Sequence, residues 1–345
     1  MTIAVALPNW VGDVVMATPT LRALRRRFPD GRILCVGRRY VRPVLEPNPW
    51  TDAFLETDKT ARAMWRTVQA LRAEAPQTAV LLPNSVRSAL LFWLAEVPRR
   101  IGYARPGRRR LLTDALEPPR RGRRRVPTPQ VTYYLALAEV LGAPTDDRRL
   151  QLCTTEEDEA AALAAFGQAR VEPEEALLLC PGYAFGPAKG WPVPHWAALA
   201  RGARERFGLR ALVLGGPRDA DIARAIVQAE PSVVSLCDRG ITLASARAVV
   251  RRARAMVTVD SGLRHYAAAF DRPVVALFGP THIGWTETWH PKEVRLQVEV
   301  PCGPCQRPEC PEGTLECMWK LEPDDVLDAL AEALARDATG GEPEG

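Results

Sequence analysis

The sequence predicts an α/β protein built from two doubly wound domains, each with a parallel sheet. The chain has 345 residues, more than one hydrophobic core usually holds, which favours two domains. Short apolar runs alternate with helical patterns, and the second half of the chain repeats the plan of the first. These runs lack polar alternation, as is typical of strands covered on both faces.

In the first half, the N-terminal apolar run at 3–7 is the first expected strand. The expected elements that follow are helices at 13–27, 61–72 and 85–95 and strands at 33–36 and 79–82. In the second half we expect strands at 177–180, 211–214, 233–236, 256–259 and 274–278, and helices at 195–207, 219–229, 243–252 and 263–270. Pro323, followed by two aspartates, favours the start of a last helix at 323–335.

The domain junction is expected between a charged helix that starts near Glu156 and the apolar run at Leu177. We therefore predict one domain at 1–170 and a second at 171–336. The second contains a cysteine-rich loop near 302–317 and the C-terminal helix. Residues 337–345 are polar and are predicted to form a disordered tail.

Composition indicates a soluble globular protein, with 47% apolar and 25% charged residues and no run of about 20 apolar residues. The N-terminus lacks a basic region before its apolar run, so we expect a cytoplasmic protein. Eight cysteines are too few for a disulfide scaffold in a chain of this length. Four isolated cysteines, Cys35, Cys153, Cys180 and Cys237, are expected to be buried thiols.

Arginines are concentrated between Arg99 and Arg125: this stretch contains eleven arginines and only two acidic residues, Asp114 and Glu117. Such a run indicates an acidic partner, for example an anionic lipid or a phosphorylated glycan. A solvated arginine-rich loop is an equally good interpretation. We expect no nucleic-acid partner, because Tyr103 is the one aromatic residue in the run and no nucleic-acid-binding motif accompanies it.

Gly12 and Asp13 follow the first strand and precede a helix. Gly12 would let a ligand approach the backbone, and Asp13 would project into a cleft between the domains. Aspartate at this position is either a helix cap, which local sequence favours, or a general base. The loop lacks the glycine pattern of dehydrogenases and the G-K-[ST] of phosphate loops, which argues against those two enzyme classes.

Two loops of the second half are candidates for binding phosphate groups. Lys189 lies between the strand at 177–180 and the next helix, where its ammonium group could neutralise a phosphate; the alternative is an exposed loop lysine. Asp260, Ser261 and Gly262 open a later helix that also carries His265. The amides of Ser261 and Gly262 could hold a diphosphate. An ordinary capped helix is the alternative.

Cys302, Cys305, Cys310 and Cys317 are spaced C-x2-C-x4-C-x6-C in a loop rich in proline and glycine. Reduced cysteines that pack a compact loop, or a labile disulfide, are the favoured interpretations. A structural zinc or iron site is the alternative, since closely paired cysteines are typical metal ligands.

Taken as an ordered set, several motifs resemble the ADP-heptose:lipopolysaccharide heptosyltransferases, most closely the heptosyltransferase II type. They are Trp10-Val11-Gly12-Asp13, Cys180-Pro181-Gly182, Phe185 to Pro192, Asp260 to His265, Pro273 to Thr281 and the cysteine loop. The resemblance spans about residues 3–330. It implies a GT-B fold of two Rossmann-like domains facing a central cleft, with the acceptor domain first and the nucleotide-sugar domain second.

By this resemblance Asp13 matches the catalytic base, and Lys189 matches the lysine that contacts the donor phosphates. Asp260, Ser261 and Gly262 match the donor-binding segment, and His265 matches a histidine of the same helix. Two departures concern donor specificity. The family commonly has a bulky basic residue where Gly190 stands and a small or nonpolar one where Arg264 stands.

The implied reaction is an inverting transfer of heptose from ADP-heptose to the lipopolysaccharide inner core, with one base and no metal or cofactor. The implied partners are an ADP-sugar donor and an acidic lipid-linked glycan, met through peripheral contact with the inner membrane surface. One alternative is a related transferase with another nucleotide sugar or a different acceptor. The other is a non-catalytic nucleotide-sugar-binding protein.

Overall fold

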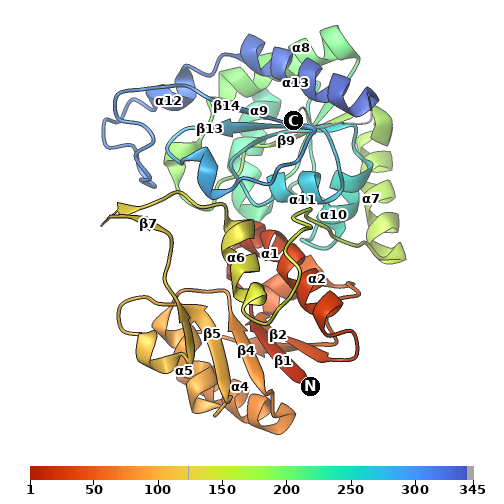
Figure 1. Ribbon diagram of the computed structural model, residues 1–345. Helices are drawn as coiled ribbons and strands as arrows, with labels where there is room; N and C mark the ends of the chain where they lie inside the picture. Colours follow the sequence, from red (N-terminus) through yellow and green to blue (C-terminus); the bar gives the residue numbers. More distant parts are fainter. Residues whose placement is uncertain (123, 340–345) are drawn as a thin grey trace. The chain divides into compact units, whose positions relative to one another are not determined.

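The computed structural model describes residues 1–122 and 124–339, which form two compact units. The first comprises Met1–Gln151 with Gly284–Thr288, and the second comprises Leu152–Ile283 and the chain from Trp289 onward (Figure 1). The division therefore precedes the boundary expected after residue 170. Helix α7 (Glu156–Ala169) belongs to the second unit because its buried Asp158 pairs with Arg247 of that unit at 2.7 Å.

The first unit is built on a parallel six-stranded sheet of order β3-β2-β1-β4-β5-β6. Its strands are β1 (Thr2–Ala6), β2 (Arg32–Arg38), β3 (Ala53–Thr57), β4 (Thr78–Leu81), β5 (Arg99–Tyr103) and β6 (Asp114–Leu116). The predicted strands are β1, β2 and β4 of the structure, which form the centre of the sheet and are buried except at the ends of β1 and β2. The outer strands carry charged residues such as Glu56 and Arg99, which obscure the apolar pattern in the sequence.

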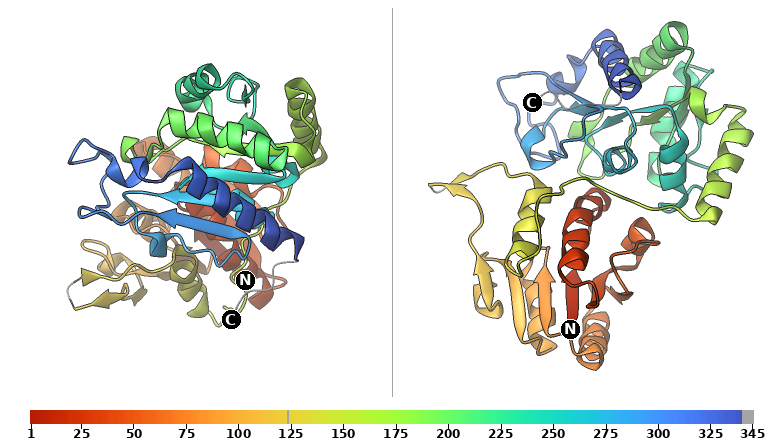
Figure 2. Two further views of the ribbon diagram at one scale, coloured as in Figure 1. Left: turned by 90° about the horizontal axis from the view of Figure 1, so that it is seen from above. Right: turned by 45° about the vertical axis from the view of Figure 1, so that its right-hand side comes forward.

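Helices cover both faces of this sheet. They are α1 (Val11–Met16), α2 (Thr18–Arg27), α3 (Arg42–Leu45), α4 (Ala61–Glu74), α5 (Val86–Leu94) and α6 (Gln130–Glu139). Helices α4 and α5 pack together on one face, and α1, α2 and α6 pack together on the other (Figure 2). The predicted helix at 13–27 is two helices that meet at Ala17, with a proline in the first turn of the second.

The second unit has the same strand order, β11-β10-β9-β12-β13-β14, again parallel. Its strands are β9 (Ala176–Cys180), β10 (Arg210–Val213), β11 (Val234–Ser235), β12 (Ala255–Val259), β13 (Val274–Phe278) and β14 (Glu293–Gln297). The order in both units is that of a dinucleotide-binding fold, in which successive strands are added outward from β1 or β9 in both directions. The prediction of two doubly wound parallel sheets is therefore confirmed.

The second sheet is covered by α8 (Val193–Phe207), α9 (Ala220–Ala229), α10 (Ser245–Arg252), α11 (Arg264–Ala269), α12 (Glu316–Trp319) and α13 (Pro323–Ala338), together with α7. Helices α8, α9 and α13 form one layer, and α7, α10 and α11 form another (Figure 2). Asp337 and Ala338 belong to α13, so the prediction of a disordered tail from residue 337 is wrong for these two residues; residues 340–345 lie outside the described part of the chain. Asp337 pairs with Arg254, which explains the longer helix.

Three of the four isolated cysteines are buried as predicted, while Cys153 is half-buried. A short antiparallel pair, β7 (Arg120–Arg121) and β8 (Arg124–Arg125), forms part of the arginine-rich stretch. Arg123 lies outside the described residues, as do the side chains of Arg121, Arg124 and Arg125. Among the described helices, none combines the length and apolar character needed to cross a bilayer.

Candidate functional site

The strand order of the second unit reverses between β9 and β12, which lie side by side at the centre of the sheet. From β9 the chain continues outward through β10, and from β12 it continues through β13 in the opposite direction. The loops that leave the two carboxyl ends therefore diverge, and such a switch point is the usual ligand position in open α/β sheets. Lys189 follows β9, and Asp260 directly follows β12.

Lys189 and Asp260, separated in sequence, meet at this edge. Lys189 ends a short 3-10 turn (Pro187–Lys189) and is almost completely buried. Its Nζ donates to Oδ2 of Asp260 at 2.5 Å and to the Asp260 carbonyl at 2.8 Å. The Phe185 ring lies 5.2 Å from the same ammonium group. The alternative of an exposed loop lysine is thus wrong, because the lysine is held in place from two sides.

The carboxylate of Asp260 is surrounded by donors. Thr281, which follows β13, donates its Oγ1 proton to Oδ2 at 2.9 Å, and Nη1 of Arg264 lies 3.6 Å from Oδ1. Burial raises the pKa of Asp260, but Lys189 and then Arg264 outweigh it, so the pKa lies below its ordinary value. Asp260 therefore remains a carboxylate that orients Lys189.

Arg264 has a second, stronger partner that the sequence did not reveal. Its side chain is fully buried, its Nε and Nη2 donate to the two carboxylate oxygens of Glu293, and the Nη2 bond is 2.9 Å long. The Phe278 ring lies 4.9 Å from its guanidinium carbon. A parallel pairing of β13 with β14 brings Glu293 opposite Val274. The arginine that departs from the family pattern thus has its own buried counterion.

Ser261, Gly262 and His265 are close in sequence to Asp260 and Arg264, the two residues that form these ion pairs. Ser261 shares a hydrogen bond of 3.0 Å with Thr258, both through their hydroxyl groups. His265 is buried, and its Nδ1 has no partner among the described residues. Burial, with Arg264 as a smaller contribution, lowers the pKa of His265 to about 3, so this ring is neutral at physiological pH. The structure brings all the predicted residues of the second half to one edge.

The cysteine-rich loop packs against the loop that carries Lys189. The amide of Ala188 donates to the carbonyl of Pro308 at 3.0 Å. A Cβ atom at Gly186 would lie 2.3 Å from that same oxygen, so only glycine allows this approach. The amide of Gln306 donates to the Pro280 carbonyl at 2.8 Å. The sequence places these segments far apart, and no local signal predicts their contact.

The four cysteines of this loop are thiols, and none of the eight cysteines in the described ranges forms a disulfide. Burial and then Cys302, Cys305 and Cys310 raise the pKa of Cys317. Backbone amides, first that of Leu315, lower the pKa of Cys310. Within the described residues, no three His, Cys, Asp or Glu side chains are arranged to hold a metal ion.

In the first unit, Asp13 and Gly12 lie in α1, directly after β1, where the strand order of that sheet reverses. Gly12 is buried and Asp13 is half-buried. The residue at the N-cap position is Trp10, whose side chain makes no capping hydrogen bond. Asp13 lies in the first helical turn, so it is not the N-cap residue. Asp13 also contributes to the raised pKa of Tyr134, after the larger effect of burial.

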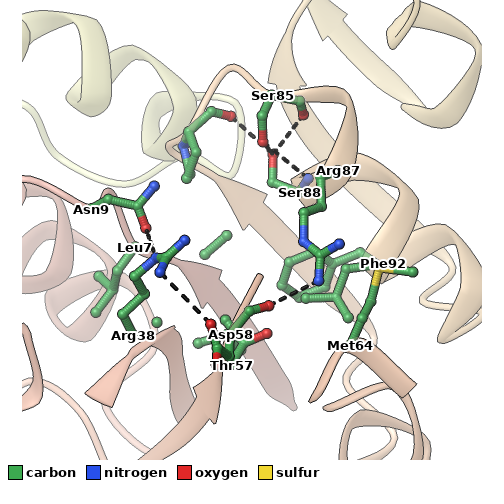
Figure 3. A pocket seen from close by; sticks show the side chains of 15 residues that line it. Leu7, Asn9, Arg38, Thr57, Asp58, Met64, Ser85, Arg87, Ser88 and Phe92 are labelled. Carbon is green, nitrogen blue, oxygen red and sulfur yellow. Dashed lines mark hydrogen bonds and ion pairs between the residues drawn. The ribbon is translucent and has the colours of Figure 1, made fainter. Parts of the chain in front are cut away.

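A pocket of about 90 Å³ opens beyond the carboxyl ends of β1 to β4 in the same unit (Figure 3). Nε of Arg38 donates to Asn9 at 3.0 Å, and Nη1 of Arg38 lies 3.8 Å from Asp58. Arg87 donates to the Asp58 carbonyl at 2.8 Å. Pro83 also lines the pocket, and its carbonyl accepts from the hydroxyl of Ser88 at 3.4 Å; that hydroxyl is hydrogen-bonded to Ser85. Apolar side chains such as Met64 and Phe92 line this pocket together with the polar ones. The pocket was not predicted, because its lining combines β1, β2, β3, α4 and α5 with the loops that follow β1, β3 and β4.

Comparisons with known proteins agree on one family. The profile of glycosyltransferase family 9 (heptosyltransferase) matches residues 64–316. Lipopolysaccharide heptosyltransferase 2 of Salmonella typhimurium is 29% identical, over 98% of this chain and 99% of its own length. Lipooligosaccharide heptosyltransferase 2 of Haemophilus influenzae is 30% identical, over 97% of this chain and 100% of its own.

Solved structures extend the same similarity to three dimensions. The structure of the E. coli ADP-heptose lps heptosyltransferase II matches with a TM-score of 0.81 and 27% identity, covering 98% of this chain and 100% of that one. A family 9 glycosyltransferase from Veillonella parvula matches with a TM-score of 0.83 and 22% identity, over 97% of both chains. The predicted GT-B fold class and the predicted resemblance are confirmed. The chain belongs to glycosyltransferase family 9 (heptosyltransferase), and it is a glycosyltransferase.

Proposed function

We propose that this protein transfers L-glycero-D-manno-heptose from ADP-heptose to the inner core of lipopolysaccharide, with inversion, as a heptosyltransferase of type II. The observation that carries this proposal is the buried Lys189–Asp260 pair at the switch point of the second sheet. The names of the near-full-length relatives, lipopolysaccharide and lipooligosaccharide heptosyltransferase 2, support the choice of heptose and acceptor.

The second unit is the proposed donor domain. An ammonium group has three protons, and two of those on Lys189 are directed at Asp260. The third is the proposed donor to a diphosphate oxygen. Neither the Ser261 nor the Gly262 amide donates a hydrogen bond to another described residue, so both are proposed to bind the same diphosphate. The amide of His265 donates to the carbonyl of Gly262 at 3.3 Å, which closes this turn.

Asp13 is the proposed catalytic base, and Gly12 is proposed to allow close approach of the substrate. The carboxylate of Asp13 takes the proton of the acceptor hydroxyl, whose oxygen forms a bond to the anomeric carbon of the donor. The bond from that carbon to the diphosphate breaks at the same time, and ADP leaves with the electron pair. The leaving group needs stabilisation of negative charge, which Lys189 and the two amides supply.

The acceptor is proposed to be an acidic glycan on a lipid, which the protein meets as a cytoplasmic protein in peripheral contact with the inner face of the membrane. Exposed arginines in the stretch from Arg99 to Arg125, such as Arg110 and Arg120, would favour an anionic surface. Loss of vesicle binding on replacing both by glutamine would support this contact, with neutral vesicles as the control.

The test of the function is ADP release from ADP-heptose with a heptose-Kdo-lipid acceptor, measured for wild type and Asp13→Asn. Release that needs the acceptor and the aspartate supports the proposal. Turnover of another ADP-sugar in place of ADP-heptose would replace the heptose assignment, and turnover only with another glycan would replace the acceptor. Tight ADP-heptose binding without turnover under any condition would indicate a non-catalytic binding protein.

A further inference from the structure

Two arginines of the first unit, Arg105 and Arg108, lie next to the carboxyl ends of β4 and β5. Arg108 is fully buried, and its Nη1 donates to the carbonyl of Pro83 at 2.5 Å. Arg105 is half-buried, and its Nη2 donates to the hydroxyl of Tyr133 at 3.0 Å. That hydroxyl in turn donates to Oδ1 of Asn84 at 3.2 Å. Arginine-rich sequence alone does not separate these two residues from their exposed neighbours.

Four nitrogen atoms of this pair have no partner. Nε and Nη1 of Arg105, and Nε and Nη2 of Arg108, are buried and make no hydrogen bond within residues 1–122 and 124–339. Each such donor has lost its hydrogen bonds to water without gaining a partner, and this desolvation cost is larger when the group is charged. Guanidinium cannot lose its proton in a protein, so it cannot avoid this cost by becoming neutral.

Among the described residues, no acidic side chain forms an ion pair with Arg105 or Arg108. Burial lowers the pKa of Arg108 to about 10, the neighbouring Arg105 contributes in the same direction, and Tyr133 opposes them. The two acidic residues of the arginine-rich stretch are engaged elsewhere. Asp114 pairs with Arg99 at 2.8 Å, and Glu117 pairs with Arg109. The cluster thus keeps two positive charges that the described residues leave without a counterion.

The backbone is shaped to accommodate these side chains. A Cβ atom at Gly102 would lie 2.7 Å from Nη2 of Arg108, so glycine in β5 makes room for the guanidinium group. Gly107, between the two arginines, has a φ of 78°, which glycine adopts at low cost. Tyr103 stacks on Tyr133 with ring centroids 3.7 Å apart, which fixes the hydroxyl that Arg105 contacts.

We propose that Arg105 and Arg108 form a binding site for an anionic group of the acceptor, a phosphate or a carboxylate. Two guanidinium groups offer paired N–H donors that match the oxygen atoms of either group. Pro83, which accepts from Arg108, also lines the pocket that holds Arg38 and Arg87, so the site adjoins a cavity. Entry of the anion requires the loop from Arg105 to Arg110 to move, because the four nitrogens are enclosed.

The identity of the ligand as an acceptor group rests on the proposed function, whereas binding of an anion does not. The first measurement is therefore the Tm of the whole protein in inorganic phosphate, against chloride at equal ionic strength. We expect phosphate to raise the Tm of wild type and of Arg110→Met, an exposed arginine of the same loop. The Tm of Arg105→Met should not respond. If phosphate raises the Tm of all three proteins equally, Arg105 does not bind the anion and the proposed site is wrong.

Arg108→Met separates a binding role from a structural one. If Arg108 is kept for an anion, removing its uncompensated charge leaves the Tm in chloride unchanged or higher and abolishes the response to phosphate. A Tm lowered in chloride, with the phosphate response retained, would show that the arginine is structural and the proposal wrong. Arg105→Met decides the matter if the Arg108 variant does not fold.

The second measurement is steady-state kinetics. In Arg105→Met the KM for the acceptor should rise about 10- to 100-fold, while the KM for the donor stays at the wild-type value. Dephosphorylated acceptor and acceptor with reduced sugar carboxylates identify the anion, since wild type and variant should become alike on the one that lacks it. If the wild-type protein shows no turnover, the proposed function is wrong. The anion site would still be tested by the Tm comparison, which does not depend on turnover.

Discussion

The two units have the same strand order but treat buried positive charge in opposite ways. At the edge of the second sheet, Lys189 and Arg264 face Asp260 and Glu293, so the charges balance within the protein. At the edge of the first, Arg105 and Arg108 have no acidic partner among the described residues. The site in the second unit has its counterions without a ligand, whereas the proposed site in the first unit would receive its counterion from an anionic ligand. Charge balance therefore distinguishes two sites that topology makes equivalent.

The largest expected effect concerns Asp13. Asp13→Asn removes the proposed base but keeps the size of the side chain, so kcat should fall about 10²- to 10⁴-fold. The Kd for ADP-heptose should stay at the wild-type value, because the donor is assigned to the second unit. The measurement pairs ADP release with calorimetric donor titration. A kcat of the variant equal to that of wild type would show that Asp13 is not the catalytic base.

The next effect tests the balance in the second unit. Glu293→Gln leaves fully buried Arg264 without its main counterion, which should lower the free energy of unfolding by about 3–5 kcal/mol. Urea unfolding followed by a probe in the second unit measures this change. The matched control, Arg264→Met combined with Glu293→Leu, should recover most of the loss. Equal stability of the single variant and wild type would show that Glu293 does not balance the charge.

A smaller effect depends on pH. The pKa of His265 is about 3 in the folded chain and about 6.5 when unfolded, so the unfolded state takes up a proton first as pH falls. Stability is therefore complete above pH 6.5 and declines below it, by about 1.4 kcal/mol per pH unit. His265→Asn should lack this decline between pH 6.5 and 5, a range above the carboxylate titrations. If stability falls with pH equally in wild type and His265→Asn, His265 is not held neutral in the folded protein.

The smallest expected effect sharpens the description of the first unit. Arg38 pairs with Asp58, whose side chain is 61% exposed, so Arg38→Gln should change the free energy of unfolding by less than about 1 kcal/mol. If the pocket of Figure 3 receives the acceptor, the same variant raises the acceptor KM. Arg26→Gln, which breaks an exposed pair with Asp146, is the control and should leave both quantities unchanged. A large loss of stability would make Arg38 structural.

The sequence was sufficient to predict the central strands and the loops that follow them, because buried strands have a continuous apolar pattern and the ligand edge follows from topology. It could not predict Glu293, which reaches Arg264 through pairing of β13 with β14. Nor could it show that Lys189 is buried, since the contact with Asp260 joins two distant loops. The position of α7 depends on the Asp158–Arg247 pair, another long-range contact.

The close approach of Gly186 to Pro308 makes the length and shape of the cysteine loop part of the specificity of a site it does not line. Among relatives, an exchange at position 308 would alter the reach of Lys189 while every residue around its ammonium group stayed the same. Transplanting the donor site into another scaffold would therefore fail unless this distant loop were carried with it.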